Sequence, residues 1–169
     1  SGVALLSANA NSVVGNFIGT DKDGNQLQSE GSAVLGNTIG IAVGNGNNNE
    51  IGGLNGSAGS RNVISGNNAG IAIGAASSDS RVTGNYIGTN AAGTAAVPNA
   101  SFGVTIFSGA QNSQIGGPGG GGNVISGQNL TGDPAVRPVG ILIGSDAGDG
   151  NAILGNIIGL DANQQNAIP

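Results

Sequence analysis

Residues able to carry acid–base or metal chemistry are few in this chain. Among 169 residues there are nine acidic and four basic side chains, with no histidine and no cysteine. The commonest general base is therefore absent, and so are disulfides and thiolate metal ligands. Polysaccharide-cleaving sites need paired carboxylates at a set separation, or a basic residue beside a metal-bound substrate. Because the basic residues lie on separate segments, we expect no catalytic residues, and a polysaccharide lyase or hydrolase is the least favoured function.

One loop has the residue types and spacing of a cation site. Thr20-Asp21-Lys22-Asp23-Gly24-Asn25 places oxygen ligands on alternate residues beside a turn glycine, like half of a calcium loop. Asp21, Asp23 and Asn25 are therefore candidate calcium ligands, and no other cofactor is expected. An ordinary Asx turn explains the same residues. The turn is favoured, because the equivalent loops 90–93 and 161–164 do not repeat the ligands.

A repeat of apolar strands would position these loops. A strand that follows a glycine occurs five times, at 2–5, 40–43, 70–73, 103–106 and 140–143. Two more apolar positions follow each strand: first Val13, Ile51, Val82, Ile115 and Ile153, then Ile18, Ile64, Ile87, Ile125 and Ile158. Each unit is one coil of a three-sided solenoid, in which equivalent apolar residues stack into an interior. We expect a single all-β domain over 1–169, with coils at approximately 1–39, 40–69, 70–102, 103–139 and 140–169.

The coils alternate between two types. Type A coils pass directly through the second turn, as in Thr83-Gly84-Asn85, whereas type B coils carry an insertion there, at 54–61 and 118–122. The order is A, B, A, B, A. Coil starts two apart differ by 68 and 70 residues (70 − 2 and 140 − 70), so the true repeat is a pair of coils.

An asparagine occupies the same turn position in all five coils. The column consists of Asn16, Asn62, Asn85, Asn123 and Asn156. Asparagine tolerates left-handed backbone at turns, and stacked amides can hydrogen-bond from coil to coil. A polar stripe that binds a ligand is the alternative, and a structural ladder is favoured because the turn itself calls for asparagine.

The repeat phrases resemble those of a known group of proteins. Residues 84–89, 112–117 and 62–67 look like the right-handed parallel β-helix repeats, of the pectin-lyase-like fold, in large bacterial surface and secreted proteins. The resemblance covers essentially the whole chain. It implies a right-handed winding and an extracellular or cell-surface location, but no reaction, because that fold carries many functions.

Several outward-facing residues have two interpretations. Phe17 and Tyr86 are equivalent and predict an outer hydrophobic stripe more than a carbohydrate track. Glu50 and Arg81 precede equivalent inward positions on neighbouring coils, which predicts an exposed cross-coil ion pair. Three Asn-X-Ser/Thr triplets start at Asn55, Asn99 and Asn129, all in predicted loops. If the producing organism glycosylates such triplets, glycans would project from the surface; chance occurrence in a chain rich in Asn, Ser and Thr explains them equally well.

Charge and the ends of the repeat indicate the kind of partner. The net charge is −5, so nucleic-acid binding is not expected, and no apolar run is long enough to insert in a membrane. No capping segment is evident, and the first and last residues match in phase the start and end of internal coils. We therefore expect a structural building block of an extracellular filament or adhesin stalk, stacking head to tail on copies of itself. The alternative is a segment of a longer surface adhesin with a carbohydrate- or calcium-binding face, in which the partners would be adjacent coils of the same array and surface polysaccharide.

Overall fold

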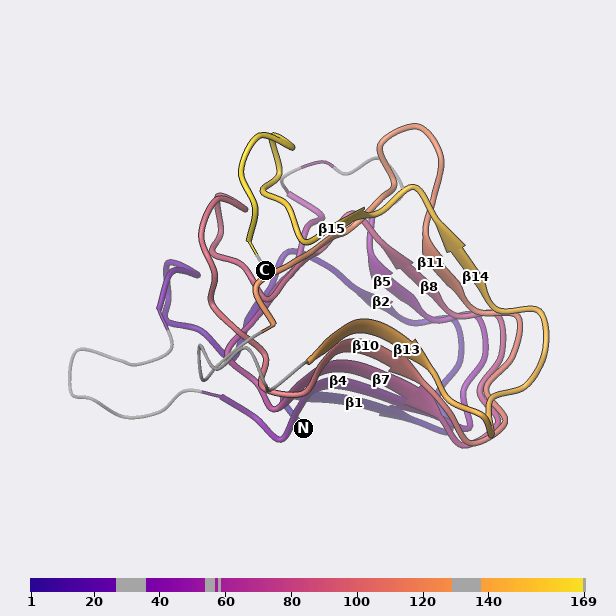
Figure 1. Ribbon diagram of the computed structural model, residues 1–169. Helices are drawn as coiled ribbons and strands as arrows, with labels where there is room; N and C mark the ends of the chain where they lie inside the picture. The colour runs from indigo at the N-terminus through magenta and orange to yellow at the C-terminus, as the bar shows by residue number, and fades with distance from the viewer. Residues whose placement is uncertain (27–35, 54–56, 58, 129–137, 169) are drawn as a thin grey trace.

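Strands of one coil after another form three parallel sheets (Figure 1). The structure is a computed structural model that describes residues 1–26, 36–53, 57, 59–128 and 138–168. The first sheet contains β1 (Val3–Leu6), β4 (Ile39–Gly44), β7 (Ala69–Gly74), β10 (Phe102–Ile106) and β13 (Val139–Ile143). The second contains β2 (Ser12–Val13), β5 (Glu50–Gly52), β8 (Arg81–Thr83), β11 (Gln114–Gly116) and β14 (Ala152–Leu154). The third contains β3 (Phe17–Ile18), β6 (Val63–Ile64), β9 (Tyr86–Ile87), β12 (Val124–Ile125) and β15 (Ile157–Ile158).

The register of the strands is that of the sequence repeat. Val82 pairs with Ile51 on one side and Ile115 on the other, and Ile87 pairs with Ile64 and Ile125 in the same way. The all-β, three-sided parallel solenoid predicted from the sequence is therefore confirmed. We number its five coils 1 to 5 by their first-sheet strands β1, β4, β7, β10 and β13.

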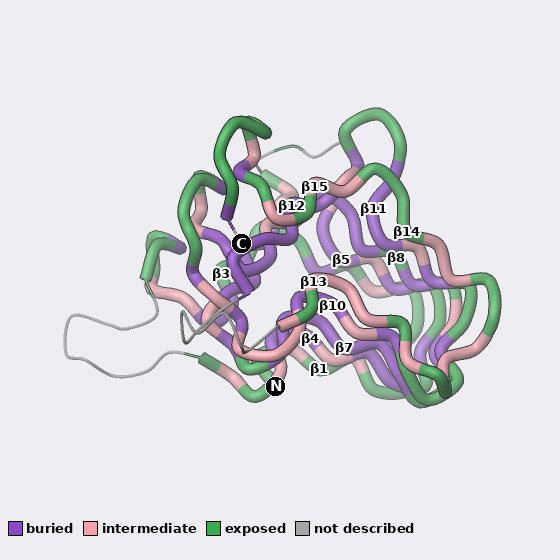
Figure 2. Tube along the Cα trace, in the orientation of Figure 1, coloured by how far each residue is buried: buried purple, intermediate pink, exposed green. Residues whose placement is uncertain are grey.

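Apolar side chains from all three sheets fill the interior. In the middle coils the inward isoleucines and valines are fully covered, with exposed fractions of 0 to 1% for Ile71, Val82, Ile87, Ile115 and Ile125. Figure 2 shows this buried stripe running along each sheet. β-Branched side chains suit such a surface, because they pack well between neighbours on a pleated strand.

A glycine ends the third-sheet strand of each type A coil, and the backbone requires it. Gly88 has φ of +83°, and a Cβ there would collide with the carbonyl oxygen of Ser126 on the next coil. Gly19 has φ of +89° and meets Ser65 of the next coil in the same way. The chain therefore leaves the solenoid at this corner in type A coils, and the loop that carries Asp21 begins here.

Candidate functional site

The five asparagines of the predicted column form a continuous hydrogen-bonded ladder. The side-chain Nδ2 of each of the first four donates to Oδ1 of the asparagine on the next coil, at 2.9 to 3.0 Å, and the series ends at Asn156. The backbone N–H of the same residue donates to that Oδ1 as well, at 3.0 to 3.3 Å. From the second coil onward, Nδ2 also donates to a carbonyl of the preceding coil, at 2.7 to 2.9 Å. These amides are engaged with one another, which favours the structural interpretation of the column.

Two further amide columns were missed in the sequence. One contains Asn37, Asn67, Asn99 and Gln128, joined in part by Asn37 Nδ2 to Asn67 Oδ1 at 2.9 Å and Asn67 Nδ2 to Asn99 Oδ1 at 3.3 Å. The other begins with Asn11, whose Nδ2 donates to Asn49 Oδ1 at 2.9 Å, and ends with Asn151, whose Oδ1 accepts the backbone N–H of Ser113. The signal of the first column was an asparagine shortly before β4, β7 and β10. In the second column an asparagine precedes β2, β5 and β14, but Ser80 and Ser113 stand at that position on coils 3 and 4.

The column through Asn99 corrects one prediction. Asn99 is fully buried, and its Nδ2 donates to the carbonyl oxygen of Ile64 on the preceding coil at 3.0 Å. A glycan attached to that nitrogen would have no room in the folded chain, so Asn99 is not a projecting glycosylation site. Asn55 and Asn129, the other two triplets, lie outside the described residues.

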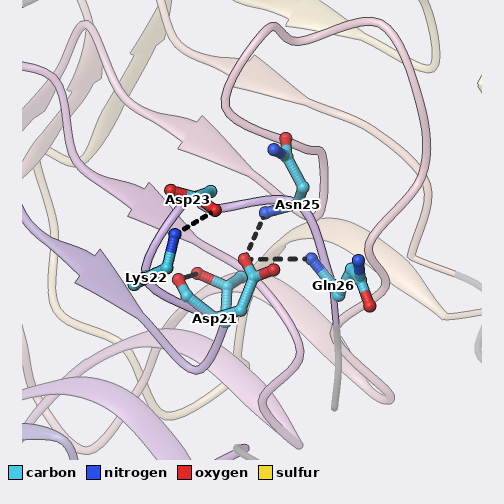
Figure 3. A network of polar contacts seen from close by, with 6 residues as sticks. Asp21, Lys22, Asp23, Asn25 and Gln26 are labelled. Carbon is cyan, nitrogen blue, oxygen red and sulfur yellow. Dashed lines mark hydrogen bonds and ion pairs between the residues drawn. The ribbon is translucent and has the colours of Figure 1, made fainter. Parts of the chain in front are cut away.

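The candidate calcium loop is a closed turn (Figure 3). Asp21 Oδ1 accepts the backbone N–H groups of Asn25 at 2.7 Å and Gln26 at 3.3 Å. Asp23 forms an exposed ion pair with Lys22, with Nζ and Oδ2 2.7 Å apart. The side chain of Asn25 points away from the Asp21 carboxylate. The three candidate ligands therefore do not converge on a common point, and within the described ranges no three His, Cys, Asp or Glu residues gather as metal ligands.

The same turn occurs where the sequence has no candidate ligands. Asn90 Oδ1 accepts the N–H groups of Thr94 at 2.8 Å and Ala95 at 3.3 Å. Asp161 Oδ1 accepts the N–H of Gln165 at 2.8 Å. The side-chain amide oxygen of Asn90 thus accepts the turn's backbone N–H groups just as the carboxylates of Asp21 and Asp161 do. This shared role supports the Asx-turn interpretation. We call the three loops, 20–26, 89–96 and 160–167, the hairpins; antiparallel bridges join the arms of the last two.

Hydrogen bonding lowers two carboxyl pKa values in the hairpins. The pKa of Asp21 lies below its usual 3.8, chiefly because the backbone N–H of Asn25 stabilises the charged form. The pKa of Asp161 is lowered too, chiefly by the side-chain amide of Asn166, whose Nδ2 lies 2.7 Å from Oδ2. Both carboxylates are therefore ionised at neutral pH and act as acceptors that close their hairpins.

The outer stripe lies on the third sheet. Phe17 pairs in register with Val63, and Val63 with Tyr86, as the sequence predicts. Phe17 is 49% exposed, whereas Val63 is 2% exposed. The guanidinium of Arg61 lies 4.0 Å from the centre of the Tyr86 ring, a cation–π contact. This face is thus partly covered by the protein itself.

Glu50 and Arg81 are register neighbours, as predicted, without an ion pair between them. They are Cα partners of β5 and β8, yet no ion pair joins their two side chains. Arg81 instead lines a shallow depression of about 140 Å³ with Asn48, Asp79, Asn112 and Gln114. Among the described residues, the side chains of Asn48, Asp79, Arg81 and Asn112 have no hydrogen-bond partner. They are therefore available to a polar ligand.

The C-terminal end face is apolar and exposed. The inward column positions on coil 5 have exposed fractions of 41% at Ile143, 45% at Ile153 and 52% at Ile158. Strands β13, β14 and β15 are at the edges of their sheets. Part of each strand's hydrogen-bonding capacity on this face is therefore left open, as at any sheet edge.

Comparisons with known proteins leave the family open. No protein-family model, no curated protein and no solved structure matched the chain. In the described part of the chain, no helix has the length and apolar composition needed to span a membrane. The parallel solenoid itself rests on the sheet topology and register.

Proposed function

We propose that this chain is a structural segment of an extracellular filament or surface adhesin stalk, a rod in which further coils stack on the end faces. The observation that carries the proposal is the C-terminal end face. Its three isoleucine positions continue columns that are closed everywhere in the middle of the stack, and they are 41 to 52% exposed. A coil placed there would bury each of these side chains, worth about 1.5–3 kcal/mol apiece when burial is complete.

Charge and ladder polarity support end-to-end growth. Only 8% of residues are charged, so little electrostatic repulsion opposes stacking. The hydrogen bonds of the asparagine ladder all run in one direction: each of the first four asparagines donates to the asparagine of the coil that follows. Asn156 is the last acceptor of the described ladder, and its backbone N–H and Nδ2 would donate to an asparagine on a further coil. A right-handed winding and an extracellular location rest on the resemblance to pectin-lyase-like β-helices.

A ligand-binding face is the second candidate function. It is favoured by the depression around Arg81, where four polar side chains have no partner within the described part of the chain. Hydroxyl and carboxylate groups of a surface polysaccharide are ligands that such side chains bind. Polysaccharide titration followed by NMR should shift the signals of Arg81 and Gln114; unchanged spectra at saturating sugar would remove this candidate.

The structural role is tested by electron microscopy of the native protein, isolated from its source. We expect unbranched rods whose length grows by about 4.8 Å per coil, so that this chain contributes about 24 Å. Isolated particles of about that length, with polysaccharide-cleaving activity, would contradict the proposal.

A further inference from the structure

The amide column at the corner between the first and second sheets is interrupted on two coils. We call it the corner column, and its members are the residues that precede β2, β5, β8, β11 and β14: Asn11, Asn49, Ser80, Ser113 and Asn151. The three middle members are fully buried, each 0% exposed. On coils 3 and 4 a hydroxyl therefore stands where the other coils have a side-chain amide.

An intact step of the corner column joins two coils through one amide. Asn49 Oδ1 accepts the backbone N–H of Asn11 at 3.0 Å and Asn11 Nδ2 at 2.9 Å. Asn49 Nδ2 in turn donates to the carbonyl of Ala8, three residues before Asn11, at 2.8 Å. Each amide of the column thus supplies an acceptor and a donor to the coil that precedes it.

The last member repeats this pattern. Asn151 Oδ1 accepts the backbone N–H of Ser113 at 3.0 Å, and Asn151 Nδ2 donates to the carbonyl of Ala110, three residues before Ser113, at 3.0 Å. The same carbonyl also accepts the backbone N–H of Gly148 at 2.9 Å. A corner carbonyl therefore has capacity for two donors, one from the backbone and one from the column.

The serines leave buried polar groups without partners. In the described part of the chain, the backbone N–H groups of Asn49 and Ser80 have no acceptor, because the next coil offers no amide oxygen. Ser80 Oγ is buried and has no hydrogen-bond partner. Buried groups of this kind are nearly always paired in folded proteins, either within the chain or with ordered water.

The corner carbonyls opposite the serines are short of a donor as well. Gly46 and Ser77 lie three residues before Asn49 and Ser80, as Ala8 lies before Asn11. Within the described ranges, the Gly46 carbonyl accepts only the N–H of Ser78 at 3.1 Å, and the Ser77 carbonyl only that of Gln111 at 2.9 Å. Donors and acceptors are thus missing together at each interrupted step.

We propose that two buried water molecules complete the corner column, one beside Ser80 and one beside Ser113. The first accepts the N–H of Asn49 and donates to the carbonyl of Gly46. The second accepts the N–H of Ser80 and donates to the carbonyl of Ser77. A hydroxyl with one water offers the same acceptor and donor as an amide, and each water then has the two to four polar partners that a buried water needs.

The size of serine and its place in the chain agree with this assignment. A serine side chain is smaller than that of asparagine by close to the size of one water molecule, which occupies about 30 Å³ in the liquid. Asp79 and Arg81, which flank Ser80 in the sequence, line the polar depression on the second sheet. The hydrated steps therefore coincide with that depression. They do not depend on stacking at the end faces, so the inference goes beyond the proposed function.

The test counts bound waters in the full chain and in three variants. Ser80→Asn combined with Ser113→Asn restores an amide on both coils, and Asn49→Ser extends the serine run by one coil. Ser12→Asn is the matched control, because it makes the same substitution at an exposed position of the same corner. High-resolution crystal structures locate the waters, and oxygen-17 relaxation dispersion counts the long-lived ones in solution.

We expect the two waters at these contacts in the chain of 169 residues, neither in the double variant, and one more in Asn49→Ser; Ser12→Asn should keep both. A crystal structure in which Ser80 Oγ itself accepts the N–H of Asn49, with no water in the column, would overturn the inference. An unchanged count in the double variant would overturn it too. If the restored amides prevent folding, an unchanged count in Asn49→Ser has the same force.

Discussion

The middle of the stack and its C-terminal coil carry the same residue type at the same register, with different outcomes. Ile115 and Ile125 on coil 4 are 0% and 1% exposed, whereas Ile153 and Ile158, their partners on coil 5, are 45% and 52% exposed. A coil therefore does not bury its own inward side chains. The next coil along the stack completes their burial, which is why a solenoid of this kind gains stability by growing.

The largest expected effect comes from truncating the inward isoleucine of the third sheet, once in the middle of the stack and once on the last coil. Ile87→Ala should lower the free energy of unfolding by about 2–5 kcal/mol, because it opens a cavity in a closed interior. Ile158→Ala should cost less than about 1 kcal/mol, because its side chain is half exposed. Urea denaturation of both variants measures the difference. Equal losses of unfolding free energy in the two variants would show that Ile158 is as well buried in solution as Ile87. The contrast between the middle of the stack and its last coil would then be wrong.

The asparagine ladder should show the same dependence on position. Asn85→Ala removes the acceptor of Asn62 and leaves buried N–H groups unpaired, so we expect a loss of about 2–3 kcal/mol in the free energy of unfolding. Asn16→Ala, at the first coil, removes an exposed donor and should cost about 1 kcal/mol. Thermal or urea unfolding checks both. A loss at Asn16→Ala that matches the loss at Asn85→Ala would refute the buried ladder as a source of stability.

The hairpins should differ in their response to pH. The pKa values of Asp21 and Asp161 are lowered in the folded chain, so their stabilisation is present above the unfolded value of 3.8 and is lost as pH falls through the folded values. The 89–96 hairpin is closed by the amide of Asn90 and has no such group. Exchange of the Asn25 and Gln165 amides should therefore accelerate relative to that of Thr94 as pH falls below 3.8 and through the lowered folded pKa values.

Asp21→Asn is the matched control for the hairpin prediction, because it copies the side chain of Asn90. This variant should keep the turn and make Asn25 exchange as independent of carboxyl titration as Thr94 exchange. A persistent acid response at Asn25 in this variant would assign the effect to another group.

Exposed charges on the second sheet should matter little. Glu50→Ala and Arg81→Ala remove register neighbours that form no ion pair, so each should change the free energy of unfolding by less than about 0.5 kcal/mol. Denaturation at low and at high salt measures both. A larger loss that salt suppresses would reveal an ion pair in solution.

Calcium should have the smallest effect of all. Asp21 Oδ1 already accepts two backbone N–H groups, and Asp23 is paired with Lys22. Millimolar calcium should leave the midpoint of thermal unfolding unchanged within error. A rise that Asp21→Asn abolishes would restore the calcium interpretation of this loop.

The sequence predicted the fold because each strand carries its own inward residues. The glycine-preceded strands, the two coil types and the column through Asn85 could all be read from spacing, since a solenoid repeats its local chemistry at every coil. The alignment of Phe17 with Val63 and Tyr86 followed from the same register.

What spacing could not give is the contact between loops. The hairpins meet two coils apart, through the backbone of Gly24 and Ala91, and no side-chain pattern reports such a contact. Burial of Asn99 was missed because its triplet resembles an exposed loop, whereas its amide belongs to a column whose members are spaced unevenly in the sequence. The expected Glu50–Arg81 pair failed for a different reason: adjacency in register does not fix where two long exposed side chains point.

Hydrogen exchange at the C-terminal end face tests the central claim most directly. The amides of Ile153, Asn156 and Ile158 would be compared between the isolated chain and the protein in the form its source makes. If further coils cover this end face in the native protein, its amides should exchange slowly there and fast in the isolated chain. Equally fast exchange in both would mean that no coil stacks there, and the structural rod would be contradicted.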